Sequence, residues 1–303
     1  MKWIATRLGR LTLRQRLVLQ AVLGSLLSYY LAILSVQVAD VLSFHNWTLF
    51  LFHMIISISV LLVLAIVIST IAQAIEIYVE KRRIVMGTAN TQLRRATVEE
   101  AQAFSRQMFL PTAERRLVPH TAEESIRLLV NGVYNTLEAH YSEASIPGES
   151  ISFESTFMTR SLEDGEITVY AWANREGRMP ASLRERARNP RIYERSVTAD
   201  IYRSAVSERP VARLIEDTRA PGESYEELYP GQKTRILCSI VYPVMSPSSD
   251  LLGTLVVHCN RARFFRHEDF GYWTELLETF AARIALEKLR LDNTVVCREL
   301  LDR

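Results

Sequence analysis

Cysteine, proline and glycine are scarce in this chain of 303 residues, which has three, ten and eleven of them. The low proline and glycine contents exclude collagen-like, low-complexity and largely disordered chains. Cys238, Cys259 and Cys297 are too few for a disulfide framework and lack the Cys-x-x-Cys spacing of zinc sites. We therefore expect a reducing compartment and no metal centre.

The chain also lacks a large excess of charge and the common catalytic motifs. Its 36 Lys and Arg are balanced by 34 Asp and Glu, so a nucleic-acid partner is not predicted. Phosphate-binding, dinucleotide-binding, serine-hydrolase and zinc-protease motifs are all missing. His258 and Cys259 are neighbours in a predicted strand and point to opposite faces, so they cannot form a nucleophile–base pair without help from other residues. The prediction is a protein that is not an enzyme and carries no cofactor.

Two long stretches lack charged residues altogether and raise the mean hydropathy to +0.03. Residues 17–39 would span about 34 Å as a helix, enough for a hydrocarbon core of about 30 Å. The second stretch, 41–75, is most apolar at 48–71. A pair of buried core helices is the alternative, but such helices are rarely apolar on every face for this length. We predict transmembrane helices at 17–39 and 48–73, which make the lipid bilayer a partner.

Basic residues flank both predicted spans, while the short loop between them has no Lys or Arg. This distribution places residues 1–16 and the C-terminus in the cytosol, in a multi-pass protein of the inner (plasma) membrane. A cleaved signal peptide is disfavoured because the first apolar run is too long and no cleavage site follows. The flanking basic residues are Lys2, Arg7, Arg10, Arg14 and Arg16 before the first span, and Lys81, Arg82, Arg83, Arg94 and Arg95 after the second.

The remaining chain alternates between helical and strand patterns. Residues 74–117 read as a connector helix and a linker, 118–292 as a folded domain and 293–303 as a tail. Within the domain a helix is followed by a predicted hairpin at 151–158 and 167–173, arginine-rich helical pieces at 181–207, a second hairpin at 235–244 and 251–259, and a helix at 267–291. This order predicts an α+β domain, an antiparallel sheet with packed helices.

From His120 to Asp292 the chain resembles a GAF domain. GAF domains show a strand ending in proline before a loop, then a Gly-x-Leu strand, a phenylalanine, an acidic pair and a closing helix. Those places are taken here by Pro243, Gly253-Thr254-Leu255, Phe264, Glu268-Asp269 and residues 285–291. Residues 198–211 resemble the helix and the following strand that come before these motifs in the family. The resemblance implies a ligand pocket between the sheet and the variable helical segment.

Cyclic-nucleotide-binding members of that family carry an Asn-Lys…Phe…Asp-Glu signature. This chain has Asn260-Arg261, Phe264 and Glu268-Asp269, with arginine in place of lysine and the acidic order reversed. The resemblance implies that this set is a structural clamp, with an ion pair between Arg261 and Asp269 that braces the sheet.

Arginine dominates the helical segment, with eleven arginines and no lysine between 175 and 219. Guanidinium groups suit phosphates, and an aromatic ring can stack on a base, so this segment could cap an anionic ligand. The alternative is a solvated, ion-paired helical surface, or one attracted to anionic lipid. The predicted ligand-binding residues are Tyr170, Trp172, Arg184, Arg188, Arg191, Tyr193, Arg195, Tyr202 and Cys238.

Two functions are compatible with these patterns. The first is a membrane-anchored sensor or effector that binds a small molecule, with a cyclic nucleotide as one candidate. It would signal through its transmembrane hairpin or through homo-oligomeric assembly, as anti-phage effectors of this build do. The second is a ligand-free module that docks a cytosolic signalling partner at the membrane. Exposed Tyr272, Trp273 and Leu276 would favour the second function, and a pocket behind Trp172 and Tyr202 the first.

Overall fold

The computed structural model describes residues 47–108, 119–141, 150–161, 164–223 and 225–301. The chain divides into two units, Met1–Ile84 and Val85–Arg303. Helix α3 (Trp47–Met108) supplies all the described residues of the first unit and the first described residues of the second. Val85, Ala89 and Ala96 are buried in the core of the second unit, which therefore includes the C-terminal part of the predicted connector.

The first predicted membrane span lies outside the described residues, and the second lies within α3. Residues 1–46, which include the first predicted span, lie outside the described residues, as do most side chains between 48 and 71. Within the described part of the chain, no helix combines the length and the apolar character needed to cross a membrane. The linker at 109–117 and the last two residues of the predicted tail also lie outside it.

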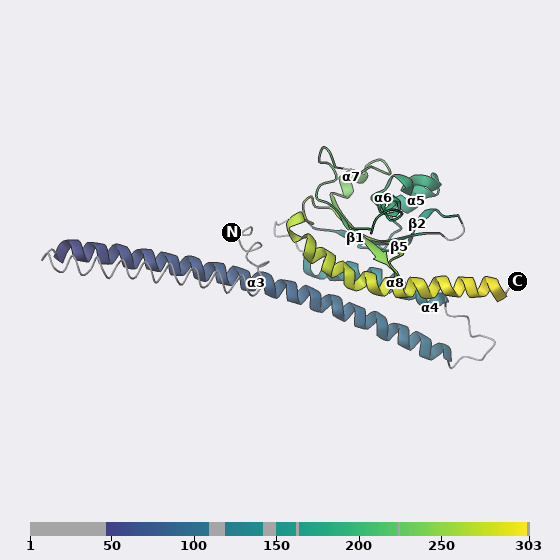
Figure 1. The fold of residues 1–303 in the computed structure, drawn as a ribbon, viewed down its shortest axis with the longest axis horizontal. Coiled ribbons are helices and arrows are strands. Elements are labelled where there is room, and N and C mark those ends of the chain that lie inside the picture. The colour runs from purple at the N-terminus through teal and green to yellow at the C-terminus, as the bar shows by residue number, and fades with distance from the viewer. Residues whose placement is uncertain (1–46, 109–118, 142–149, 162–163, 224, 302–303) are drawn as a thin grey trace. The chain divides into compact units, whose positions relative to one another are not determined.

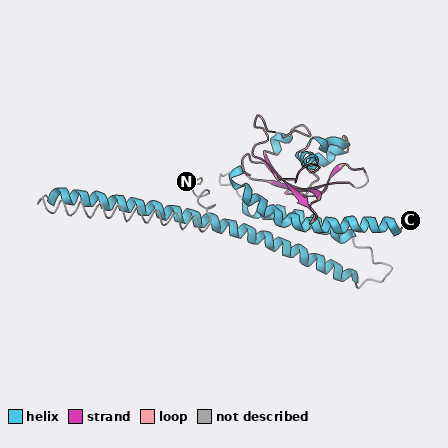
Figure 2. Ribbon diagram, in the orientation of Figure 1, coloured by secondary structure: helices cyan, strands magenta, loops and turns pink. Residues whose placement is uncertain are grey.

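Five antiparallel strands form one sheet in the second unit, in the order β2-β1-β5-β4-β3. Figures 1 and 2 show these strands lying between helices. The strands are β1 (Phe153–Arg160), β2 (Ile167–Asn174), β3 (Arg213–Ile215), β4 (Cys238–Met245) and β5 (Leu251–Cys259). The two predicted hairpins appear as β1–β2 and β4–β5, and they meet through the pairing of β1 with β5. The predicted α+β plan, an antiparallel sheet with packed helices, is confirmed.

Helices cover both faces of this sheet (Figure 1). The helices α4 (Pro119–Tyr141) and α8 (Phe270–Leu301) pack on one face, over the larger apolar core. The other face carries α5 (Ala181–Arg186), the 3₁₀ helix η1 (Pro190–Arg195) and α6 (Val197–Ser204), over a smaller core. Two further short elements are α7 (Gln232–Arg235) and the 3₁₀ helix η2 (His267–Asp269).

The two-residue period of the strands decides which side chains reach each face. In β1, Phe153 and Phe157 lie in the larger core, and the Ser155 hydroxyl donates a 2.8 Å hydrogen bond to the carbonyl of Val130 in α4. Glu154 and Thr156, between them, reach the face that α5, η1 and α6 cover. This alternation positions the cavity described next.

Candidate functional site

A cavity of about 50 Å³ lies between the sheet and the helical segment that covers its second face. The sheet supplies side chains from β1, β2, β4 and β5, while α5, η1, α6 and the loop before α7 close the cavity. Ser196, the N-cap of α6, helps to hold this cover because its hydroxyl accepts a 3.2 Å hydrogen bond from the Ala199 N–H. The lining residues used below are Glu154, Thr156, Tyr193, Tyr225, Glu226, Ser239, Val256 and His258.

Three polar side chains form a row across the sheet at this cavity. Glu154 in β1 is the register partner of His258 in β5, which is also the partner of Ser239 in β4. Ser239 Oγ and His258 Nδ1 are 2.9 Å apart and share a hydrogen bond. Because register partners have their side chains on the same face, strand pairing brings these three groups together from distant parts of the sequence.

Burial changes the protonation of two members of this row. It lowers the pKa of His258 to about 4, so the imidazole is neutral at pH 7. It raises the pKa of Glu154 to about 7, although nearby Arg235 opposes that rise and Glu176 adds to it. Near neutral pH the Glu154 carboxyl is therefore divided between its protonated and ionised forms, whereas the adjacent histidine carries no charge.

Two tyrosines present unsatisfied hydroxyl groups. Tyr193 and Tyr225 line the cavity and are only 2% and 8% exposed. Neither buried hydroxyl oxygen has a hydrogen-bond partner of good geometry within the described ranges, although Ser182 lies near the Tyr193 hydroxyl and Gln232 near that of Tyr225. Leaving a buried polar group unpaired costs about 1–3 kcal/mol, so a polar molecule in the cavity would recover part of that cost.

A second, larger cavity of about 360 Å³ lies beside the first, where β1 begins and β2 ends. Glu154 and His258 line both cavities and form their shared wall. Unlike the inner cavity, the larger one is lined by two arginines, Arg175 and Arg235, and both are exposed.

The predicted aromatic and cysteine ligands separate onto the two faces of the sheet. Tyr193 lines the inner cavity, and Trp172 packs partly buried in the core of the same face. Tyr202 is in that core too, where its hydroxyl accepts a 3.2 Å hydrogen bond from the Arg160 N–H. Tyr170 and Cys238 belong instead to the core under α4 and α8, so the structure does not bring them to the cavity. Ser239, the next residue in β4, points to the opposite face of the sheet from Cys238 and lines the cavity.

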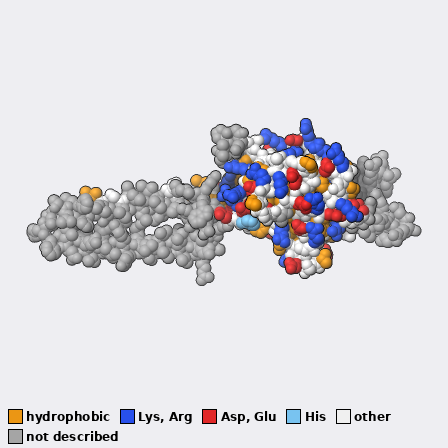
Figure 3. All heavy atoms as spheres, turned by 90° about the horizontal axis from the view of Figure 1, so that it is seen from above, with side chains coloured by type: hydrophobic (Ala, Val, Ile, Leu, Met, Phe, Trp, Pro, Cys, Tyr) orange, Lys and Arg blue, Asp and Glu red, His pale blue; other side chains and the backbone are white. Residues whose placement is uncertain are grey.

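The predicted arginines are not among the described residues that line the inner cavity, but Arg195 pairs with Glu226, which is one of them. Arg184, Arg188, Arg191 and Arg195 are exposed. Arg188 pairs with Glu185 at 3.4 Å and Arg191 with Glu194 at 3.6 Å, while Arg195 pairs with Glu226. Basic and acidic side chains are interspersed over this face (Figure 3). The arrangement is that of the solvated, ion-paired surface that the sequence left open as an alternative.

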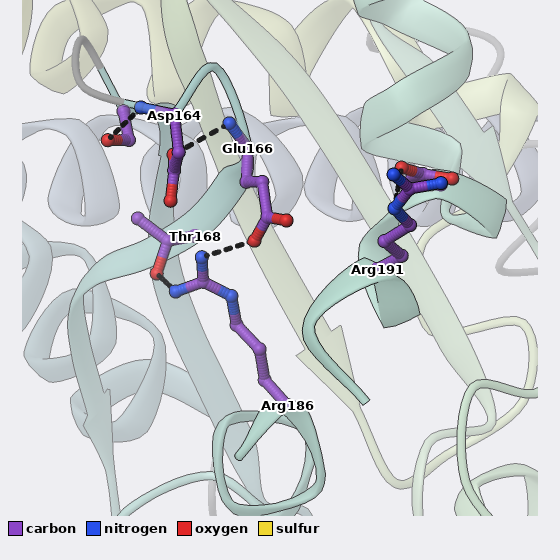
Figure 4. Close-up of polar contacts among 7 residues, drawn as sticks. Asp164, Glu166, Thr168, Arg186 and Arg191 are labelled. Carbon is purple, nitrogen blue, oxygen red and sulfur yellow. Dashed lines mark hydrogen bonds and ion pairs between the residues drawn. The ribbon is translucent and has the colours of Figure 1, made fainter. Parts of the chain in front are cut away.

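Arg186 has a different, structural position. Its side chain reaches from α5 toward β2, where it hydrogen-bonds Thr168 and pairs with Glu166 at 3.3 Å (Figure 4). Only 22% of this side chain is exposed. The contact fastens the helical cover to the edge strand of the sheet.

The residues of the predicted clamp have unequal roles. The Asn260 side chain accepts a 2.9 Å hydrogen bond from the Ser152 N–H and donates one of 3.1 Å to the Ser150 carbonyl, so it ties the start of β1 to the end of β5. Phe264 lies edge-to-face with Tyr141 and Phe153. Arg261 and Asp269 are half-buried and Glu268 is exposed. The ion pair between Arg261 and Asp269 stays a prediction.

Sequence reasoning missed Glu154, Ser239, His258 and Tyr225. Ser239 and His258 lie between apolar residues of their strands, and Glu154 lies between Phe153 and Ser155, whose side chains face α4 and α8. A strict two-residue period in each predicted hairpin could therefore have placed the three on one face. It could not have paired them, because the register between β1 and β5 joins separate hairpins. Tyr225 lies in a loop and gave no comparable signal.

No protein-family model and no curated protein matches the chain, whereas several solved structures do. The GAF domain of the Acinetobacter phosphoenolpyruvate-protein phosphotransferase is 12% identical and has a TM-score of 0.39, with 67% of this chain and 93% of that chain covered. The blue-light absorbing form of the Thermosynechococcus elongatus PixJ GAF domain is 14% identical with a TM-score of 0.36, and the match covers 62% of this chain and 95% of that chain. The type II free methionine-R-sulfoxide reductase of Thermoplasma acidophilum is 13% identical with a TM-score of 0.37, and the match covers 56% of this chain and 96% of that chain.

Proposed function

We propose that this chain is a membrane-anchored sensor whose GAF-like domain binds a small molecule in the inner cavity. The observation that carries the proposal is the cavity itself, in which the hydroxyls of Tyr193 and Tyr225 are buried without partners among the described residues. The residues 17–39 and 48–73 would anchor the domain, as their lack of charge predicts.

The cavity is placed where a ligand could change the domain. Its lining combines sheet residues with residues of η1, α6 and the loop before α7, so a bound molecule would hold the helical cover to the sheet. A ligand shifts a conformational equilibrium only if it binds one arrangement better. The arrangement with the cover closed on the sheet is the one that completes this site. Output would then pass to the membrane hairpin or through assembly of several copies.

The alternative function, a ligand-free interaction module, would be favoured by exposed residues on the last helix, but those residues are buried. Tyr272, Trp273 and Leu276 lie on α8 and are buried in the larger core. Trp273 packs against Phe264 and Phe265 with ring centroids 5.5 and 5.0 Å apart, so it contributes to folding instead of to an exposed docking face.

The nucleotide form of the proposal, and with it the anti-phage role, has less support. No arginine or lysine is among the described residues that line the inner cavity, and about 50 Å³ is too small for a nucleotide. The larger cavity, with Arg175 and Arg235 at its wall, is the better place to look for an anion of that size.

A ligand screen on the full-length chain tests the sensor function. We expect at least one small molecule from a chemically broad set to raise the melting temperature, because it binds the folded state only. Val256→Phe should abolish that rise, since Val256 lines the cavity and the larger ring would fill it. The milder Val256→Leu serves if the first variant does not fold. Val211→Phe, at an exposed position of the same unit, is the matched control and should keep the response. If no molecule stabilises the chain, or if Val256→Phe responds normally, the proposal fails.

Membrane anchoring has a separate test. We expect the full chain to stay in the membrane fraction after alkaline carbonate extraction, and removal of residues 1–74 to release it. A reporter that fluoresces only in the cytosol should be bright when fused after Arg303. The same reporter inserted between residues 43 and 44, in the predicted outer loop, should be dark. Release of the full chain by carbonate, or a dark fusion at Arg303, would refute the anchored topology.

A further inference from the structure

We infer that the inner cavity binds a small organic cation, a primary amine of about four non-hydrogen atoms whose ammonium group pairs with Glu154. The inference rests on the proposed function, because it names the ligand class of the same cavity. Three features support it: the charge of the lining, the aromatic hydroxyls and the volume.

The charged groups of the lining favour a cation. Glu154 and Glu226 are the two carboxylates among the described lining residues, which include no lysine or arginine. Glu226 already pairs with Arg195. Within the described ranges Glu154 has neither an ion pair nor a side-chain hydrogen bond, so its carboxylate is left for the occupant. An anion in the inner cavity would meet this carboxylate and a neutral histidine, whereas Arg235, the basic side chain that acts on Glu154, lines the larger cavity instead.

The polar and aromatic groups around Glu154 suit an ammonium ion. The unpartnered hydroxyl oxygens of Tyr193 and Tyr225 can accept N–H hydrogen bonds, and their rings can attract a cation. A metal ion is a poor alternative, because no cluster of three or more His, Cys, Asp or Glu side chains that could hold one occurs in the described part of the chain.

The volume limits the size of the amine. One water molecule needs about 10–15 Å³ of such space, so a cavity of about 50 Å³ holds about three to five water-sized groups. Ethanolamine, with four non-hydrogen atoms, has this size and adds a hydroxyl that could bond the second tyrosine. Ethylene glycol and acetate have the same number of non-hydrogen atoms and carry charges of zero and minus one, so the three molecules differ mainly in charge.

Protonation of Glu154 gives the binding a pH signature. An amine needs the ionised carboxylate, and aliphatic ammonium groups keep their proton between pH 6 and 8. Burial raises the pKa of Glu154 to about 7. The titratable or charged groups that line its two cavities or act on it are His258, Tyr193, Tyr225, Tyr229, Glu176, Glu226, Arg175 and Arg235. His258 stays neutral over this range because burial lowers its pKa to about 4. The ionised fraction of Glu154 thus rises about tenfold from pH 6 to 8, and amine affinity should rise with it.

Calorimetric titration of the purified full chain in detergent provides the test. At pH 8 we expect ethanolamine to bind at least tenfold more tightly than ethylene glycol or acetate, and at pH 6 about tenfold more weakly than at pH 8. Glu154→Gln should remove both the binding and its pH dependence. Glu194→Gln is the matched control, and it should leave the affinity within about twofold because Glu194 is not among the described lining residues and pairs with Arg191 on the surface.

Each other outcome is decisive. Tighter binding of ethylene glycol or acetate overturns the cation while the sensor function stands. Binding of none of the three overturns the amine, and the broad screen described above decides separately whether the cavity binds anything. Equal losses in Glu154→Gln and Glu194→Gln would also overturn the site. If Glu154→Gln does not fold, Tyr225→Phe replaces it and should weaken ethanolamine binding several-fold without removing the pH dependence; unchanged affinity in that variant overturns the inference.

Discussion

A Gly253→Ala substitution is expected to lower the free energy of unfolding by about 2–4 kcal/mol, because a methyl group has no space at this position. A Cβ there would lie 2.5 Å from Cε2 of Phe157 and 2.6 Å from the carbonyl oxygen of Met158. Neither atom can easily retreat. Phe157 is fully buried, and the Met158 carbonyl belongs to β1, which pairs with β5 along six register positions.

Urea denaturation of the Gly253→Ala chain measures this effect. The matched control is Gly87→Ala in α3, where a Cβ would meet nothing within 4 Å. That change should raise the free energy of unfolding by about 0.5–1 kcal/mol, because alanine is the better helix former. A cost below about 0.5 kcal/mol at Gly253 would contradict the close approach of β5 to Phe157, since overpacking a dense core usually costs more than that.

Gly253 also shows what the sequence could establish. The Gly-x-Leu pattern that suggested a GAF domain falls on β5, the central strand, and the structure explains the glycine through its contact with Phe157. The two hairpins and the closing helix were predictable for a similar reason, because each depends on the periodicity of a continuous segment.

The cavity was not predictable to the same degree. Which residues face it depends on strand phase and on the pairing of β1 with β5, and both are fixed by packing between distant segments. The predicted Cys238 lies in the core on the other face of the sheet, whereas its neighbour Ser239 lines the cavity. The arginines were predicted to bind an anionic ligand because of their number, and the structure shows Arg188, Arg191 and Arg195 paired with acidic residues on the surface. Their role as ligand contacts stays a prediction.

Phe280→Ala is expected to lower the free energy of unfolding by about 3–5 kcal/mol, through lost burial and the cavity left behind. Phe280 is a fully buried residue of α8. A Cβ on Gly132 of α4 would lie 3.0 Å from its ring, so the ring fills the space that the missing glycine side chain leaves between the two helices. Urea denaturation measures the loss. Leu286→Ala on the same helix, at a side chain that is 46% exposed, should cost much less.

A second substitution distinguishes this contact from general core damage. In the Phe280→Ala background, Gly132→Ala should recover part of the lost stability, because its methyl group enters the vacated space and alanine favours the helix. In the unchanged chain the same Gly132→Ala should gain less or destabilise, since the ring stands 3.0 Å from the new atom. Additive effects of the two changes would mean that Phe280 does not occupy the space over Gly132. Positive coupling would place the ring at the close approach of α4 and α8, beneath the sheet whose other face holds the cavity.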